Sequence, residues 1–353
     1  MRKAGSERTG RHRGRTPVAP AYAAVDLGTN NCRMLAARPI GGGLRIVDSF
    51  SRIVRLGEGA SVSGVLDEAA IERTIAALKI CAGKIRRLGA KRVRNIATQA
   101  CRAATNGASF LNRVKAETGL ELETISADEE ARLTVSGCVP LFETERPFVL
   151  MFDIGGGSTE VTWIEQQDAT SPRILGTRSV AIGVMTIADQ LGTGVLPPAA
   201  TAEIRSNIDA KLADLDQAHG ISDHIAAGRV QMMGTSGTVT TLGGIHLDLR
   251  RYDRSKVDGI EIPFSSIEAI IERLGGLSEE ERARIPCVGP QRADLMIAGC
   301  TLLQTVCARW NVGRVTVADR GIREGLLCEM MAADGLTQEA RPIPSFEVET
   351  ILP

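Results

Sequence analysis

Apolar residues occur along this chain in short runs that are separated by turns and by longer amphipathic stretches. The first run, residues 22–25, is followed by a glycine-containing turn and a second run at 33–37, which predicts two strands joined by a tight turn. Further strand-like sequence covers 44–47 and 51–56. Apolar residues then recur at helical spacing before a glycine, which predicts an amphipathic helix: Ile71, Ile75, Leu78, Ile85 and Gly89.

Strand and helix continue to alternate after this helix. Residues 93–97 read as a buried strand, 110–114 lie in a second helix that ends at Gly119, and 122–125 read as another strand. Alternation of this kind is typical of an α/β fold.

The pattern of the first strand and turn returns later in the chain. An apolar residue, an aspartate, an apolar residue and a glycine occur at 25–28 and again at 152–155, with the two aspartates 127 residues apart. This offset is about one domain length, so it indicates an internal repeat and two related α/β halves.

The second half repeats the order of elements. A helix around 204–212, a strand at 230–233, a glycine-rich loop at 234–238 and a helix that follows the loop are predicted, and then a long helix from about 293 to 310, a strand at 315–317 and a last helix from about 322 to 331. We therefore expect a first domain at 21–143, a second domain at 144–321, and irregular structure at 335–353.

Composition excludes several functional classes. The 42 Lys and Arg residues balance 42 Asp and Glu residues, and only 3% of residues are aromatic, so neither a field that attracts nucleic acid or membranes nor a stacking platform for single strands is expected. Residues 1–20 carry six basic residues against one acidic residue, which predicts a disordered basic tail. Such a tail either contacts polyanions or merely keeps the chain in solution.

The cysteines and the apolar runs indicate a cytoplasmic protein. The eight cysteines form no CxxC pair and no zinc-like cluster, so we expect reduced, buried side chains. The longest apolar stretches fall short of the roughly 18 residues that span a bilayer, and the basic N-terminal residues precede no apolar signal region. We expect no export and no membrane span.

Three turns rich in glycine and hydroxyl residues each follow an apolar strand. Glycine lets backbone N–H groups approach phosphate oxygens, and Ser and Thr add donors, so the three turns together predict a phosphate site between two domains. No GxxxxGK[ST] or GxGxxG motif is present. The predicted phosphate-binding residues are Gly28, Thr29, Asn30 and Asn31, then Gly155, Gly156, Gly157, Ser158 and Thr159, and then Gly234, Thr235, Ser236 and Gly237.

Several charged residues lie beside these turns. Asp26 and Asp153 end the strands that enter two of them and could hold Mg²⁺, with Glu160 on the returning strand, although an aspartate before glycine also often shapes its own turn. Arg33 and Arg102 are placed to bind a polyanion or to form surface ion pairs.

Glu130 lies at a predicted helix start, which Ser126 or Asp128 would cap, in a segment rich in acids. The spacing alone leaves it open as a catalytic base or as a favourable charge at the helix dipole. The four histidines show no arrangement with a nucleophile, so covalent catalysis is not indicated.

Taken together, five segments resemble the exopolyphosphatase and guanosine pentaphosphate phosphohydrolase family. These segments are residues 26–30, 129–133, 153–160, 234–242 and 321–327, and the resemblance extends from about 21 to 331. The glycine turns indicate only the wider superfamily of actin, sugar kinases and Hsp70 ATPases. The Glu-Glu-Ala-Arg and Gly-Ile-Arg-Glu-Gly segments are more specific to the phosphatases.

The resemblance implies two actin-like, ribonuclease H-like domains with an active site in the cleft between them, and a last helix at 322–332 that returns to the first domain. It implies Glu130 as the general base, Asp153 and Glu160 as Mg²⁺-associated acids, the first two turns as phosphate loops, and Arg102 as a phosphate contact. Asn31 stands where the family usually has serine. Long members also have a C-terminal helical domain, and since this chain ends soon after its second domain, we expect less processive action on very long polyphosphate.

We therefore expect an Mg²⁺-dependent phosphoanhydride hydrolase that releases terminal orthophosphate from polyphosphate or the 5′ γ-phosphate from guanosine pentaphosphate. An ATP-dependent kinase of the same superfamily and a non-catalytic sensor of polyphosphate or of the guanosine alarmone are the alternatives. We expect no specific nucleic acid and no membrane among the partners, and the sequence leaves a monomer and a homodimer both open.

Overall fold

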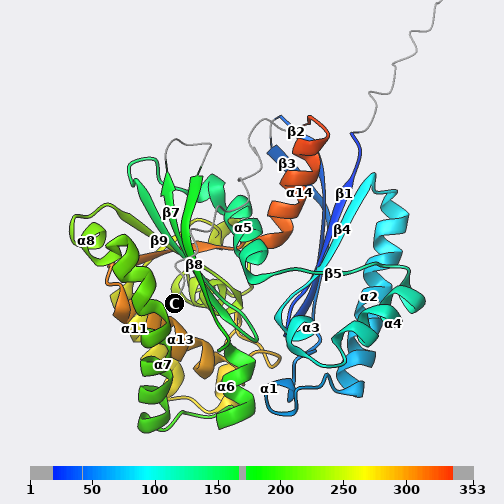
Figure 1. Cartoon of the computed structure of the whole chain (residues 1–353). Coiled ribbons are helices and arrows are strands. Elements are labelled where there is room, and N and C mark those ends of the chain that lie inside the picture. Colours follow the sequence, from blue (N-terminus) through cyan, green and yellow to red (C-terminus); the bar gives the residue numbers. More distant parts are fainter. Residues whose placement is uncertain (1–18, 42, 167–171, 337–353) are drawn as a thin grey trace, which may run out of the picture.

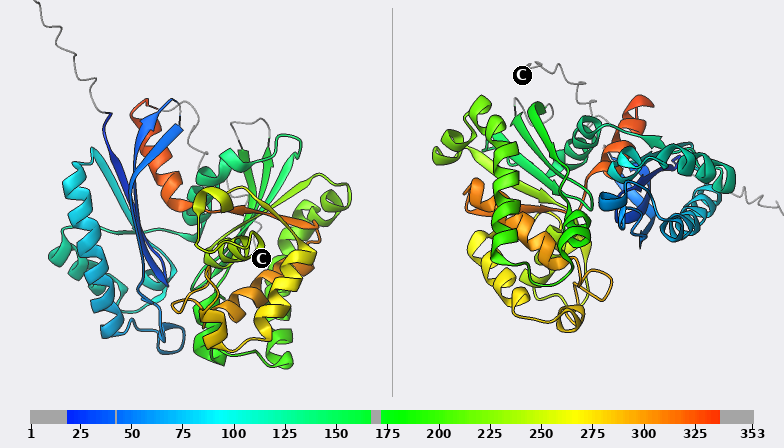
Figure 2. Two further views of the ribbon diagram at one scale, coloured as in Figure 1. Left: turned by 180° about the vertical axis from the view of Figure 1, so that it is seen from behind. Right: turned by 60° about the horizontal axis from the view of Figure 1, so that its bottom comes forward.

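The computed structural model describes residues 19–41, 43–166 and 172–336. The predicted tails at 1–20 and 335–353 therefore fall almost wholly outside the described residues. Two lobes lie side by side, each built around one β-sheet (Figures 1 and 2). The α/β class and the strand, turn, strand order predicted for residues 22–37 and 148–164 are confirmed.

The first lobe contains a five-stranded sheet in the order β3-β2-β1-β4-β5. The strands β1 and β2 and the strands β2 and β3 pair antiparallel, whereas β4 runs parallel to both β1 and β5. The strand bounds are β1 (Tyr22–Leu27), β2 (Asn31–Ile40), β3 (Gly43–Ile53), β4 (Arg92–Ala97) and β5 (Glu123–Thr124).

The second lobe contains a six-stranded sheet in the order β10-β11-β9-β6-β7-β8. Its centre repeats the first sheet, because β6 and β7 pair antiparallel while β6 and β9 are parallel. The strand bounds are β6 (Phe148–Ile154), β7 (Thr159–Gln166), β8 (Pro172–Val180), β9 (Val230–Thr235), β10 (Glu261–Pro263) and β11 (Arg314–Ala318).

The helices cover the outer faces of the sheets and fill the space between them. In the first lobe they are α1 (Ala60–Ser63), α2 (Glu68–Leu88), α3 (Gln99–Ala103), α4 (Gly107–Thr118) and α5 (Ala127–Cys138), which a 3-10 turn at Val139–Leu141 follows. The remaining helices are α6 (Val184–Leu191), α7 (Pro198–His219), α8 (Ile221–Ala226), α9 (Gly237–His246), α10 (Arg254–Val257), α11 (Phe264–Gly275), α12 (Glu279–Ala283), α13 (Met296–Arg309) and α14 (Ile322–Ala333).

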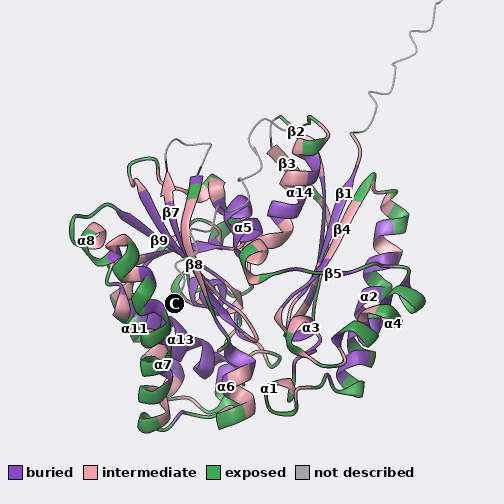
Figure 3. Cartoon of the chain, viewed as in Figure 1, coloured by how far each residue is buried: buried purple, intermediate pink, exposed green. Residues whose placement is uncertain are grey.

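Apolar packing on the outer face of each sheet forms the two large cores. In the first lobe this face packs against α2 and α4, and in the second lobe against α7, α9, α11 and α13. Buried residues concentrate in the central strands, and exposed residues in the outer helices (Figure 3). Burial of these apolar faces is the main favourable contribution to folding.

Two helices, α5 and α14, pack on the inner faces of the sheets. The apolar face of α14 packs against β1, with Leu326 and Leu327 in the same cluster as Ala24. The last helix therefore packs on the first sheet, although it follows the last strand of the second sheet. One side of α5 joins this cluster through Leu133, and the other side packs on the second sheet through Val135. Helix α5 therefore touches both lobes.

Glycine allows α5 and α14 to approach almost to backbone contact. A Cβ atom at Gly325 would lie 2.1 Å from the carbonyl oxygen of Leu133, and one at Gly137 would lie 2.1 Å from that of Gly321. Both distances are far inside van der Waals contact, so any side chain at these positions would push the helices apart.

Seven of the eight cysteines are buried and all eight are free thiols, as the sequence predicts. Among the described residues, no helix is both long enough and apolar enough to cross a membrane.

Candidate active site

Two turns of the same geometry face each other between the lobes. The Gly28 N–H donates to the Asn31 carbonyl across the first turn, and the Gly155 N–H donates to the Ser158 carbonyl across the second, each at 2.9 Å. The repeat seen in the sequence is therefore a repeat of structure.

Neighbouring segments engage the carbonyl oxygens of both turns. The carbonyl of Thr29 accepts from Gly57, and that of Asn30 accepts from Val54 and Arg55. In the second turn the carbonyls of Gly155 and Gly156 accept hydrogen bonds from the N–H groups of the first two residues of α6. The donor–acceptor distances are 3.0 and 2.8 Å.

The N–H groups at the tips of these turns have no protein partner in the described chain. This holds for Thr29 and Asn30 in the first turn and for Gly156 and Gly157 in the second. Converging unpaired N–H groups are the usual backbone cradle for phosphate oxygens.

The turns also touch one another. A Cβ atom at Gly156 would lie 3.0 Å from Cβ of Thr29, and one at Gly157 would lie 2.8 Å from the Thr29 hydroxyl. Glycine is required here by close approach. The contact leaves one cavity of about 130 Å³, with residues of both lobes in its wall: Asp26, Gly28, Thr29, Asn30, Asn31, Arg33, Thr98, Gln99, Glu130, Asp153, Ile154, Gly155, Gly156, Gly157, Ser158, Val184, Ser236, Gly237, Thr238, Arg292, Leu295, Met296 and Ile322.

The third predicted loop reaches this cavity only in part. Ser236 caps α9 with its hydroxyl, which accepts from the Val239 N–H, and it has φ of 142°, a strained value for a residue with a side chain. Ser236 and Gly237 line the cavity, whereas Gly234 and Thr235 lie inside β9. The predicted Thr159 also lies outside the cavity wall.

Glu130 lies in the first turn of α5, where the sequence predicted a helix start. Ser126 caps this helix by accepting from the Glu129 N–H, so of the two predicted caps Ser126 is confirmed, and Asp128 lies inside the helix. The Glu130 side chain is 12% exposed and lines the cavity. Burial and the negative charge of Glu160 raise its pKa well above the ordinary value, although Arg102 opposes this shift.

Arg102 contacts Glu130 and does not line the main cavity. Its Nη1 atom lies 3.4 Å from Glu130 Oε2 and donates to the Ile125 carbonyl at 2.6 Å, and its Nη2 atom donates to Gln99 Oε1 at 2.7 Å. This fork fixes the guanidinium on α3, so in this conformation Arg102 orients a carboxylate where the sequence predicted a phosphate contact.

Asp153 and Glu160 face each other across β6 and β7. The two residues are directly paired in the antiparallel register, which places their side chains on the same face of the sheet. A small cavity of about 10 Å³ joins them to Glu130. Burial and then the charge of Glu160 raise the pKa of Asp153 to about 8. Burial also raises the pKa of Glu160, which accepts from the Ser179 hydroxyl at 2.8 Å.

Asp26 and Arg33 are the corresponding pair of the first lobe, directly opposite across β1 and β2. Burial raises the pKa of Asp26, while the positive charges of Arg33 and Arg323 lower it. The first turn therefore has a cation where the second has a second acid.

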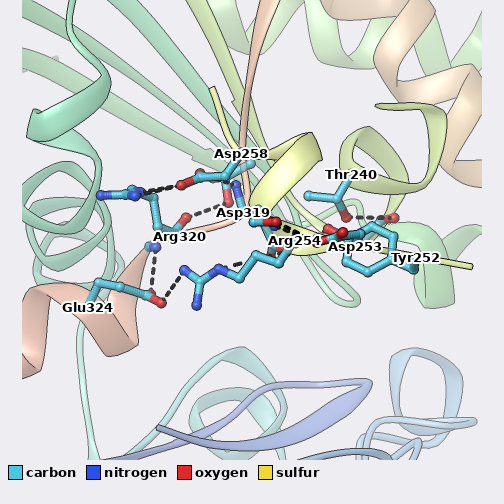
Figure 4. A network of polar contacts seen from close by, with 12 residues as sticks. Thr240, Tyr252, Asp253, Arg254, Asp258, Asp319, Arg320 and Glu324 are labelled. Atoms are coloured by element: carbon cyan, nitrogen blue, oxygen red, sulfur yellow. Dashed lines mark hydrogen bonds and ion pairs between the residues drawn. The ribbon is translucent and has the colours of Figure 1, made fainter. Parts of the chain in front are cut away.

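A polar network fixes the start of α14 to the second lobe (Figure 4). Arg254 binds Glu324 at 2.6 Å, and the other oxygen of Glu324 accepts from the Gly321 N–H at 3.0 Å. Arg320 binds Asp258 at 2.5 Å. Helix α14 is thus tied to the second lobe at its first turn and packs on the first lobe along its length.

A second set of contacts joins the lobes at the edge of the cleft away from α5 and α14. Arg55 binds the buried carboxylate of Asp294 at 2.6 Å. Asp189 on α6 accepts from the Gly59 N–H at 3.1 Å and from the Ser61 hydroxyl at 2.8 Å. Figure 1 shows α1 and α6 meeting at this lower edge. The structure therefore presents the cleft closed on both sides, and we name these contacts of Arg55 and Asp189 the rim contacts.

One cation in the cavity wall is not indicated by any motif. Arg292 lies in the irregular segment before α13 and donates to the Thr241 hydroxyl at 3.2 Å. No local pattern marks this residue, because it reaches the cavity only through the packing of α9 against α13. The sequence predicted helix from about residue 293, whereas α13 begins at Met296, and the intervening residues line the cavity and the rim.

The chain is similar to known proteins over most of its length. The model of the Ppx/GppA phosphatase family matches residues 36–334. A guanosine-5'-triphosphate,3'-diphosphate pyrophosphatase of Photobacterium profundum is 31% identical over 323 residues, which are 90% of this chain and 61% of that protein. The chain thus spans about three fifths of this relative. Exopolyphosphatase 2 of Mycobacterium tuberculosis is 29% identical, over 86% of this chain and 96% of that one.

Solved structures agree with this assignment. The crystal structure of the Aquifex aeolicus member of the Ppx/GppA family has a TM-score of 0.71 and 26% identity, and the match covers 89% of this chain and 99% of that one. An exopolyphosphatase structure from Cytophaga hutchinsonii has a TM-score of 0.79 over 90% of this chain and all of that one, and at 22% identity it supports the actin-like fold. The resemblance found in the sequence is confirmed: the chain belongs to the Ppx/GppA phosphatase family.

Proposed function

We propose that the chain is an Mg²⁺-dependent phosphoanhydride hydrolase that removes the terminal phosphate of inorganic polyphosphate or the 5′ γ-phosphate of guanosine pentaphosphate. The observation that carries this proposal is the placement of the Glu130 carboxylate on the wall of the cavity that the unpaired N–H groups of both turns also line. The names of the relatives from P. profundum and M. tuberculosis support both substrates.

The chain's own residues supply a base and an anion cradle. In the proposed reaction Glu130 accepts the proton of a water that attacks the terminal phosphorus in line with the leaving oxygen. The N–H groups of the two turns stabilise the charge on the phosphoryl oxygens. Arg102 holds the Glu130 carboxylate in place, and the raised pKa of Glu130 makes it a stronger base toward water.

The donor chemistry of Asp153 and Glu160 fits a hard divalent cation. Among the described residues no three His, Cys, Asp or Glu side chains are arranged to hold a metal by themselves. Mg²⁺ in phosphoryl-transfer sites commonly uses one or two carboxylates and takes its other ligands from water and substrate. Asp153 and Glu160 would hold it, with Asp26 nearby. When bound, Mg²⁺ would neutralise charge on the phosphate chain and on this crowded set of acids.

The proposed location is the cytoplasm, which the eight free cysteines support. A homodimer is compatible with this site but is not required by it, because every residue used above comes from one chain.

The test is phosphate release from short polyphosphate, long polyphosphate and guanosine pentaphosphate, each with Mg²⁺ and with chelator. Release from at least one substrate is expected, faster on short than on long polyphosphate. Transfer that depends on an added acceptor, with ATP as donor, would instead select a kinase, and tight binding without turnover would select a sensor.

Glu130→Gln is the matching variant. It should keep the fold and substrate binding and lower kcat by about 10²- to 10⁴-fold, the usual contribution of a positioned base. Asp128→Asn is the control, because Asp128 is exposed in the same first turn of α5 and does not line the cavity. Near-full turnover by Glu130→Gln would exclude this role for Glu130.

A further inference from the structure

Asn31 presents a buried amide oxygen that has no partner. The residue lines the cavity, and its Oδ1 atom is shielded from solvent and receives no hydrogen bond from any described residue. Leaving a buried acceptor unpaired is costly, so such a group in a folded protein calls for an explanation.

Hydrogen bonds hold the backbone of Asn31 and of the residue before it in place. The Asn31 carbonyl accepts from Gly28 at 2.9 Å, and the preceding residue accepts from two N–H groups of the segment after β3. The strand register places Asn31 on the same sheet face as Arg33 and Asp26. The side chain is therefore held on the face where the proposed reaction takes place.

The corresponding position of the second turn does not share this feature. Ser158 lies 127 residues later, and its hydroxyl donates to Glu160. That side chain is satisfied within the protein, whereas the amide oxygen of Asn31 is left for something that enters the cavity.

The chemistry of an acceptor limits what that ligand is. Phosphate oxygens are themselves acceptors and would be repelled by Oδ1, whereas water offers two donors. We infer that Asn31 is a positioning residue whose Oδ1 atom accepts a hydrogen bond from the attacking water. Asn31 on β2 and Glu130 on α5 would then orient this water together. This inference rests on the proposed hydrolase function.

The test compares Asn31→Ala, Asn31→Asp and Asn95→Ala in the full chain. Asn95 is the matched control, since it also has a buried unpaired Oδ1 atom. It lies on β4 beside Val25 of β1, so its side chain is on the sheet face opposite to that of Asp26. The readouts are kcat and KM for phosphate release from the best substrate, and the melting temperature of the ligand-free protein.

For Asn31→Ala we expect kcat to fall at least tenfold while KM changes less than twofold, and the melting temperature of the free protein to stay equal or to rise. Asn31→Asp keeps an acceptor in place, so it should recover part of the lost kcat, with a higher KM because the added charge opposes a polyanion. Asn95→Ala should leave both kinetic constants unchanged.

Two results would overturn the inference. A raised KM with unchanged kcat in Asn31→Ala would show that the amide binds phosphate through its NH₂ group. A fall in the melting temperature of the free Asn31→Ala protein well beyond that of Asn95→Ala would show that Oδ1 is paired inside the protein. The melting temperatures can be compared without any turnover. A wild-type protein that releases no phosphate would therefore count against the proposed function, while the melting temperatures would still show whether Oδ1 of Asn31 is paired inside the protein.

Discussion

The two turns at the centre of the molecule share one backbone and differ in charge. Each is closed by an N–H to carbonyl bond of 2.9 Å, and each follows a strand whose last residue but one is aspartate. The residue opposite the aspartate is Arg33 in the first lobe and Glu160 in the second. The same scaffold therefore presents one turn that favours anions and one that favours cations.

This difference shows how a duplicated fold gains a directional site. Two identical turns would cradle a phosphate symmetrically and would give no preference for where a metal binds. With an arginine on one side and a second acid on the other, a phosphate between the turns would have the proposed Mg²⁺ on its second-lobe side. Glu130 on α5, which contacts both lobes, lies beside this asymmetric pair.

The largest expected effect separates the two aspartates. Asp153→Asn should lower kcat at saturating Mg²⁺ by about 10²-fold or more, because it removes half of the proposed metal site and with it several kcal/mol of charge stabilisation. Asp26→Asn should cost less than about tenfold, since Arg33 and Arg323 already offset its charge. Equal losses in a side-by-side assay would mean that the lobes do not differ in this way.

Arg33→Gln should sharpen the comparison from the anionic side. Loss of a charged contact to phosphate, roughly 1.5–3 kcal/mol, should raise KM by about tenfold or more with a smaller change in kcat. The increase should shrink at high salt, where ionic contacts are screened. Arg52→Gln serves as control, because Arg52 lies on the exposed strand β3. A KM for Arg33→Gln equal to that of the control would contradict the assignment.

Gly325→Ala tests the close packing of α14 against α5. The new Cβ would meet the Leu133 backbone at 2.1 Å, so we expect a loss of about 1–3 kcal/mol in the free energy of unfolding, measured by denaturant titration. Gly83→Ala in α2 is the control, since its nearest neighbour is the end of a flexible arginine at 3.9 Å. That substitution should be neutral or slightly stabilising. Similar stabilities for the two variants would show that α5 and α14 separate without cost.

The last prediction concerns pH and the second turn alone. The pKa of Asp153, raised to about 8 from an unfolded value near 4, means that the folded protein binds more protons than the unfolded chain between these values. Stability of the metal-free protein should therefore fall as pH rises from about 4 to 8. Melting curves of chelator-treated protein should show this slope, and Asp153→Asn should reduce it. An unchanged slope in the variant would assign it to the other acids.

Much of the centre of this molecule was accessible from sequence because it depends on local rules. The turns need glycine, the strands before them need apolar runs, and the α5 start needs a cap at Ser126, so each leaves a short pattern. The internal repeat then paired Asp26 with Asp153. The local pattern could not decide the role of Glu130, because an acidic residue in the first turn of a helix also interacts favourably with the helix dipole.

The remaining features depend on contacts between distant segments. Arg292 reaches the cavity, Arg55 binds Asp294, and Arg102 pairs with Glu130 only after helices from both lobes have packed. Contacts between segments that are distant in the sequence leave no spacing pattern from which they could be predicted. The same holds for Gly325, whose partner Leu133 lies far away along the chain and whose need for glycine is purely steric.

The rim contacts have a consequence for the order of events in turnover. Arg55 bound to Asp294 and Asp189 bound to Ser61 exist only while the lobes are together, as does any ligand held by both turns. By thermodynamic linkage, whatever favours the joined lobes also tightens the grip on the ligand, and the reverse holds equally. For the proposed hydrolase, departure of product and parting of the rim contacts would then be coupled, so that weakening one would favour the other.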